Sequence, residues 1–221
     1  MRLINSLAVI LNDKCTGCKI CSQVCPTLAI TMEPVPGTKH KKLAVVEEEN
    51  CTGCTACEQR CPFDAIEMTN LEESRMIGVD ISLSNYEEVQ KICYDAHLHP
   101  EQIVCYCTST RADEVAAAIL QGADTPDKIS QRTGLRTGCT VECLQPAIRM
   151  LKSAGIELEA PKGRYQWYGE TPTIWSIPDE VKEKYSKRGF HFDEDIEFLE
   201  KLRNAPLSST TCQLQVKGEE K

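Results

Sequence analysis

Aromatic side chains are scarce in this sequence. Only 5% of its 221 residues are aromatic. A chain of this length forms one or two small domains, and so few aromatic residues argue against one large apolar core. Something else must help to hold the fold together, and the two candidates are disulfides and bound metal.

The sequence also lacks a long apolar run and a secretory signal. No stretch approaches the run of about 18 apolar residues that a membrane-spanning helix needs. The N-terminal stretch MRLINSLAVILNDKC has no small-residue cleavage site, so it is a poor signal peptide. These absences predict a soluble, cytoplasmic chain without a membrane span, in which thiols stay reduced and free to bind metal.

An excess of positive charge is absent too. The chain has 25 Lys and Arg against 33 Asp and Glu, which gives a net charge of −8. Binding to nucleic acid requires a basic face, so we expect no nucleic-acid partner. The one basic run, KHKK at 39–42, lies in a Pro- and Gly-rich stretch and is expected to be a solvated hairpin tip.

Cysteine, by contrast, is abundant, with 14 residues. The run CTGCKICSQVCP at 15–26 returns 36 residues later as CTGCTACEQRCP at 51–62, and both have the spacing C-x2-C-x2-C-x3-C-P. An internal repeat indicates two similar structural units, which we expect to pack about a pseudo-two-fold axis. One tight loop can point three thiolates at one cluster, while the fourth cysteine lies on the following helix and faces away. Zinc sites and disulfides offer no reason for this spacing.

Residues 1–70 strongly resemble the bacterial two-[4Fe-4S] ferredoxin family, with all eight ligand positions and both prolines present. In that family the fourth cysteine of each run ligates the other cluster. The resemblance implies that one [4Fe-4S] cluster is held by Cys15, Cys18, Cys21 and Cys61. It implies that a second is held by Cys51, Cys54, Cys57 and Cys25.

Residues 71–100 are predicted to form a helical connector. A helix is expected from a capping box of Ser84 and Glu87, with Cys93 on its apolar face as a buried structural thiol. A second cysteine system follows in residues 101–155, where Cys105 and Cys107 end an apolar run. A short helix that starts near Thr125 and Pro126, where proline suits the first turn, is expected between this pair and a later one. That later pair is Cys139 and Cys143.

We expect Cys143 to lie at a helix N-terminus, where the helix dipole favours a thiolate. The stretch 105–150 resembles the bacterioferritin-associated-ferredoxin-like iron–sulfur domain, which normally carries [2Fe-2S]. The sequence departs from that family in its second pair, which has C-x3-C instead of C-x2-C. The resemblance implies a third iron–sulfur cluster, for which we favour [4Fe-4S] with [2Fe-2S] as the alternative. A structural zinc ion is a further alternative for these four cysteines.

Residues 156–221 are interpreted as an extended aromatic arm with a helix and a mobile tail. Trp167 and Trp175 lie in the arm and are expected to cover the small cluster domains or to contact a partner. In FDEDIEFLEKLRN we expect a helix with Ile196, Leu199 and Leu202 facing inward. Cys212 in the tail is expected to be free.

The overall prediction is an α+β protein: a pseudo-symmetric ferredoxin-like module, a small helical iron–sulfur domain and a C-terminal arm. The sequence has no P-loop, no G-x-G-x-x-G and no catalytic triad order, so we expect no catalytic site of its own. Sets of four thiolates leave a cluster no free position for substrate, which favours electron transfer.

A relay of this kind serves as a subunit of a larger oxidoreductase, in a hetero-oligomer. The combination resembles the small electron-transfer subunit of the class II benzoyl-CoA reductases of anaerobic metabolism, which implies a tungsten-pterin partner. A flavin-dependent partner is the alternative. A cluster storage or assembly scaffold is the rival interpretation from another functional class.

The iron content of anaerobically purified protein tests these assignments. Three [4Fe-4S] clusters would give about twelve irons per chain, and a [2Fe-2S] cluster at the third position would give about ten. About eight irons with one zinc ion would exclude a third electron-carrying site.

Overall fold

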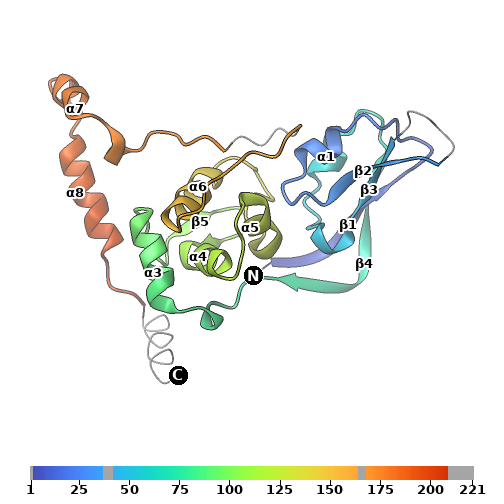
Figure 1. Cartoon of the computed structure of the whole chain (residues 1–221), viewed down its shortest axis with the longest axis horizontal. Helices are drawn as coiled ribbons and strands as arrows, with labels where there is room; N and C mark the ends of the chain where they lie inside the picture. Colours follow the sequence, from blue (N-terminus) through green and yellow to red (C-terminus); the bar gives the residue numbers. More distant parts are fainter. Residues whose placement is uncertain (1, 37–41, 164–167, 209–221) are drawn as a thin grey trace.

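The structure is a computed structural model, which describes residues 2–36, 42–163 and 168–208. An N-terminal module of small sheets, a helical domain and a C-terminal arm with two helices follow one another across the molecule (Figure 1). This is the predicted α+β architecture. Residues 39–41 of the basic run, Trp167 and Cys212 lie outside the described residues.

The N-terminal module consists of two β-α-β halves that match the sequence repeat. Its elements are β1 (Arg2–Ile10), α1 (Ile20–Val24) and β2 (Ile30–Pro34) in the first half, then β3 (Lys42–Val46), α2 (Ala56–Gln59) and β4 (Ile66–Ile77). β1 pairs antiparallel with β4, and β2 pairs antiparallel with β3. Every strand of one half therefore pairs with a strand of the other, so neither half has a complete sheet alone.

The repeat also extends to unusual backbone conformations. Three pairs of positions, each 36 residues apart, have positive φ angles: Gly17 and Gly53, Lys19 and Thr55, Leu28 and Asp64. Non-glycine residues rarely adopt such angles. Their recurrence at equivalent positions shows that the two cysteine loops follow the same path.

The helical domain is built around α4 (Ala112–Leu120), which packs against the other three helices of the domain. These are α3 (Tyr86–Asp95), α5 (Pro126–Thr133) and α6 (Leu144–Ser153), and a short hairpin of β5 (Ile103–Cys105) and β6 (Thr110–Arg111) precedes α4. Ala116, Ala117 and Ala118 of α4 are fully buried, because small side chains let helices approach on several sides. Cys93 is also fully buried in this core, as its place on an apolar stripe predicts.

Helix starts agree with the sequence at one position and differ at another. The Thr125 hydroxyl accepts a hydrogen bond from the Lys128 N–H, and Pro126 occupies the first turn of α5, as predicted. For α3 the expected cap at Ser84 is wrong. Asn85 caps this helix, and its side-chain oxygen accepts from the Glu87 N–H. The helix begins one residue later because an Asn side chain is an equally good cap.

The C-terminal arm carries η3 (Ile174–Ser176), α7 (Asp179–Ser186) and α8 (Phe192–Arg203). The Trp175 ring stacks on His97 with centroids 4.1 Å apart, and its Nε1 donates to Glu200 of α8. No residue of α8 is fully buried, and Leu202, expected to face inward, is 51% exposed. Polar contacts at the end of α3 hold this helix: Arg203 donates to the Tyr94 carbonyl at 3.3 Å, and Glu200 Oε1 lies 3.4 Å from His97 Nδ1. Across the described ranges, no helix is long and apolar enough to cross a membrane.

The packing of α6 yields a stability prediction. Leu151 is fully buried, so Leu151→Ala leaves a cavity and is expected to lower the free energy of unfolding by about 3 kcal/mol. Leu83→Ala is the matched control because Leu83 is 74% exposed. Anaerobic thermal melts of the cluster-loaded proteins should show a clear drop for the first variant only. Equal melting temperatures for both variants would contradict the observed core.

Candidate functional site

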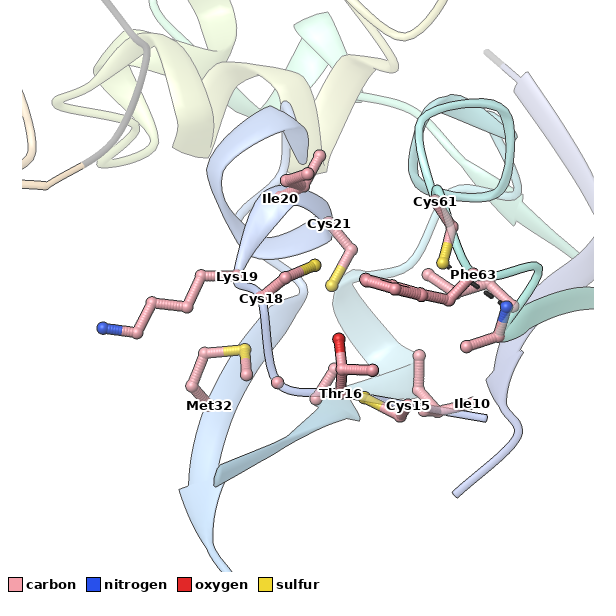
Figure 2. Close-up of a pocket in the computed structure, with 14 residues that line it drawn as sticks. Ile10, Cys15, Thr16, Cys18, Lys19, Ile20, Cys21, Met32, Cys61 and Phe63 are labelled. Carbon is pink, nitrogen blue, oxygen red and sulfur yellow. Dashed lines mark hydrogen bonds between the residues drawn. The ribbon is translucent and has the colours of Figure 1, made fainter. Parts of the chain in front are cut away.

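Four cysteines from both halves of the module surround one hollow of about 330 Å³. This first site comprises Cys15 and Cys18 of the first loop, Cys21 in α1, and Cys61 after α2. Figure 2 shows these four side chains around the hollow, with Phe63 beside them. The fourth cysteine therefore comes from the second repeat.

The reciprocal arrangement forms the second site. Cys51 and Cys54 of the second loop and Cys57 in α2 line a hollow of about 300 Å³ together with Cys25, which directly follows α1. The two hollows are similar in size. The short helix α1 thus links the sites, because it contains Cys21 of the first and ends at Cys25 of the second.

Close backbone approaches shape both loops. A Cβ atom on Gly17 would lie 2.1 Å from the Lys42 carbonyl oxygen, and one on Gly53 would lie 2.4 Å from the Ser6 carbonyl oxygen. Each loop therefore packs against a strand of the opposite half, and only glycine fits at these positions.

Backbone amides also reach the two crossing cysteines in equivalent ways. The Ala29 N–H donates to Cys25 Sγ at 3.3 Å, and the Ala65 N–H donates to Cys61 Sγ at 3.4 Å. Amide donors of this kind are typical partners of the sulfur ligands of iron–sulfur clusters. The sequence shows Ala29 and Ala65 as repeated positions but gives no sign that their amides donate.

Burial and mutual repulsion oppose the ionisation of Cys21 in the first site and of Cys57 in the second. Burial, with the neighbouring Cys18, Cys15 and Cys61 adding to it, raises the pKa of Cys21 to about 11. Burial together with neighbouring thiols of the second site raises the pKa of Cys57 to about 12. Cys21 and Cys57 are therefore protonated at neutral pH in the free protein, and binding them to iron would release their protons.

The remaining four cysteines form the third site, in the helical domain. Cys105 ends β5, Cys107 follows in the turn, and Cys143 is the N-cap of α6. A Cβ atom on Gly138 would lie 2.5 Å from Cys107 Cβ, so the loop that carries Cys139 passes tightly against the first pair. Side-chain hydrogen bonds join Cys143 to Cys105 and Cys107 to Cys139. The structure thus brings together the four cysteines that the sequence singled out.

The charge distribution in this site differs from the sequence expectation. Cys143 does lie at the start of α6, but its pKa is raised because it donates its proton toward Cys105 and is buried. The same bond lowers the pKa of Cys105 to about 5. The N–H groups of Val141 and Glu142 lower the pKa of Cys139. The expectation that Cys143 itself readily forms a thiolate is therefore wrong for the free protein, since its closest neighbour takes the negative charge.

One edge of the third site is open to solvent. Cys105 and Cys143 are buried, whereas Cys107 and Cys139 are exposed. Trp175, expected to cover the small cluster domains or to contact a partner, stacks on His97 just after α3. The exposed edge is flanked in sequence by Tyr106, which is 80% exposed, and Val141, which is 68% exposed.

The donor set fits iron–sulfur chemistry. All cysteines in the described ranges are free thiols, and twelve of them form three sets of four around the loops described above. In those ranges no three His, Cys, Asp or Glu side chains lie close enough together to hold a single metal ion. Four thiols, tight glycine turns and amide donors are the surroundings that iron–sulfur clusters use.

Comparison with known families agrees with these sites. Residues 14–65 match the family model of the 4Fe-4S dicluster domain, and residues 103–153 match that of the BFD-like [2Fe-2S] binding domain. No curated protein matches the chain. The chain is therefore an iron–sulfur protein with a dicluster ferredoxin domain and a BFD-like domain. The second family binds [2Fe-2S], the alternative that the sequence left open for the third cluster.

Crossed ligation is tested by removing one crossing cysteine. Cys25→Ala is expected to damage the cluster held with Cys51, Cys54 and Cys57, although Cys25 belongs to the other sequence run. Site-resolved Mössbauer and EPR spectra of the loaded protein provide the measurement. Cys93→Ala is the control, because this thiol faces the helical core and should leave all clusters intact. Damage confined to the first site would show that ligation is not crossed.

Proposed function

We propose that this chain is a non-catalytic electron-transfer subunit that relays single electrons through its three sites. The supporting observation is the grouping of twelve thiols into three complete sets of four. Bound clusters would supply reversible one-electron chemistry. The residues of the chain hold them in complete sets of four and leave no ligand position for substrate.

The contact between the two domains suggests the order of the relay. Gln131 of α5 donates its side-chain N–H to the Thr27 carbonyl at 2.7 Å, and the Thr27 hydroxyl lies 3.5 Å from Cys25 Sγ. Thr27 is 1% exposed and lines the second site. The helical domain therefore packs directly on the surroundings of the second site. We infer the order first site, second site, third site.

Exchange with a partner is proposed at the exposed edge of the third site. Cys107 and Cys139 are the most accessible ligands of that set, and the neighbouring Tyr106 and Val141 offer apolar contact. Exposed aromatic residues of the arm, Phe190 and Phe198, provide a second apolar surface. Exposed apolar groups of this kind favour binding to another protein.

We propose a larger redox subunit as that partner, in a hetero-oligomer. The sequence resemblance to the small subunit of class II benzoyl-CoA reductase supports a tungsten-pterin subunit first. A flavin-containing subunit is the alternative partner that the sequence resemblance leaves open. The metal and flavin content of the native complex separates these two.

The scaffold interpretation fits the geometry less well. Cys25 and Cys61 each lie in one repeat and complete the site of the other. Releasing either cluster would therefore disturb both halves of the module. A scaffold needs a cluster that leaves easily, whereas these two sites stabilise each other.

Cluster retention distinguishes relay from scaffold. We expect the loaded chain, mixed anaerobically with an excess of apo-ferredoxin, to keep its iron while undergoing reversible reduction by dithionite. Labelling the clusters with radioactive iron and counting each protein after separation measures how much iron the chain keeps and how much the acceptor gains. Rapid transfer of most of the iron to the acceptor would overturn the relay.

The partner is tested by purification from the native host. We expect the chain to co-purify with a larger subunit that contains tungsten, and the isolated loaded chain to show no substrate turnover. Flavin in place of tungsten would replace the favoured partner with the alternative. Turnover by the chain alone would contradict its role as a non-catalytic subunit.

A further inference from the structure

A buried ion pair lies beside the third site. Arg136 Nη1 lies 3.2 Å from Asp127 Oδ1, and both side chains are at most 5% exposed. Burying charges is costly unless they are paired. The hydroxyl of Tyr168, which comes from the C-terminal arm and is itself buried, donates to the other carboxylate oxygen of Asp127.

Arg136 is connected to the third site through its own backbone. Its N–H donates to the sulfurs of Cys105 and Cys143. The residue has a φ of 69°, a conformation in which glycine is normally preferred. Strained residues of this kind gather at functional sites. In addition, Arg136 Nε is buried without a hydrogen-bond partner among the described residues.

A buried cation at this place has a predictable electrostatic effect. An iron–sulfur cluster with four thiolates becomes more negative when it accepts an electron. A nearby guanidinium in a medium of low dielectric constant stabilises that added charge, and charge and hydrogen bonds set cluster potentials. The Asp127 carboxylate acts in the opposite direction, and its pairing with Arg136 limits the effect.

We propose that Arg136 is a positioning residue that raises the reduction potential of the cluster in the third site. Its amide holds Cys105 and Cys143, and its guanidinium favours the reduced state. Asp127 and Tyr168 fix the guanidinium and partly offset its charge. This role rests on the proposed function, in which the third site holds an iron–sulfur cluster.

The test compares variants that remove each charge separately. Arg136→Gly removes the cation, keeps the backbone N–H and suits the positive φ. Asp127→Asn removes the anion and keeps the size of the side chain. EPR-monitored redox titration of the loaded full chain gives the midpoint potential of the third cluster. We expect a lower potential in Arg136→Gly, a higher one in Asp127→Asn, and an intermediate value when both substitutions are combined.

The control is an exposed ion pair at the start of α5, in which Lys128 Nζ lies 2.8 Å from Asp124 Oδ2. Lys128→Gln should leave the potential unchanged, because both side chains are about half exposed to solvent. The clusters of the first and second sites serve as internal references in every titration.

Opposite shifts of the midpoint potential in Arg136→Gly and Asp127→Asn would identify side-chain charge as the cause, because structural damage would not shift the potential in opposite directions. Shifts of the same sign, or none, in variants that retain the third cluster would overturn the role of Arg136. If Arg136→Gly does not retain the cluster, Arg136→Gln is expected to lower the potential and Arg136→Lys to hold it near the wild-type value. Equal midpoint potentials in Arg136→Gln and Arg136→Lys would likewise overturn the proposed role of Arg136. A wild-type chain without a third cluster would instead refute the proposed function.

Discussion

Crowded thiolates repel one another, and this repulsion is the constraint on which the structure depends. Burial and neighbouring sulfurs raise the pKa of Cys21 and Cys57 far above neutrality. Bound iron would offset the negative charge of these two thiolates, so cluster binding would contribute to folding. This explains how a chain with few aromatic residues forms a compact module, and why glycines and donated amides surround the sulfurs.

The crossed arrangement of the two repeats makes each half of the module depend on the other. Cys25 and Cys61 each complete the site of the opposite half, and every strand also pairs across the halves. Loss of one site therefore weakens the other. The helical domain adds its own cysteines and packs on the second site through Gln131 and Thr27, which places all three sites in one continuous structure.

The ferredoxin repeat could be predicted because its information is local. Cysteine spacing, the glycines and the 36-residue offset together specify two loops of the same shape, and the structure has them. The missed features depend on contacts between distant residues. Trp175 stacks on His97, and Cys143 donates to Cys105, and no periodicity in the sequence encodes either pair. The link between Arg136 and Tyr168 was equally hidden, since it joins a loop to a distant arm. The cap at Asn85 was missed for a smaller reason, because Ser and Asn are equivalent caps.

Continuity of the three sites is tested most directly by magnetic coupling. EPR spectra of the full chain would be recorded during stepwise reduction, with the third cluster and the second cluster each brought to the paramagnetic state. Contact between the helical domain and the second site predicts that reduction of the second site broadens or splits the signal of the third. A third-site signal that keeps its shape and relaxation rate whether the second site is oxidised or reduced would contradict a continuous relay.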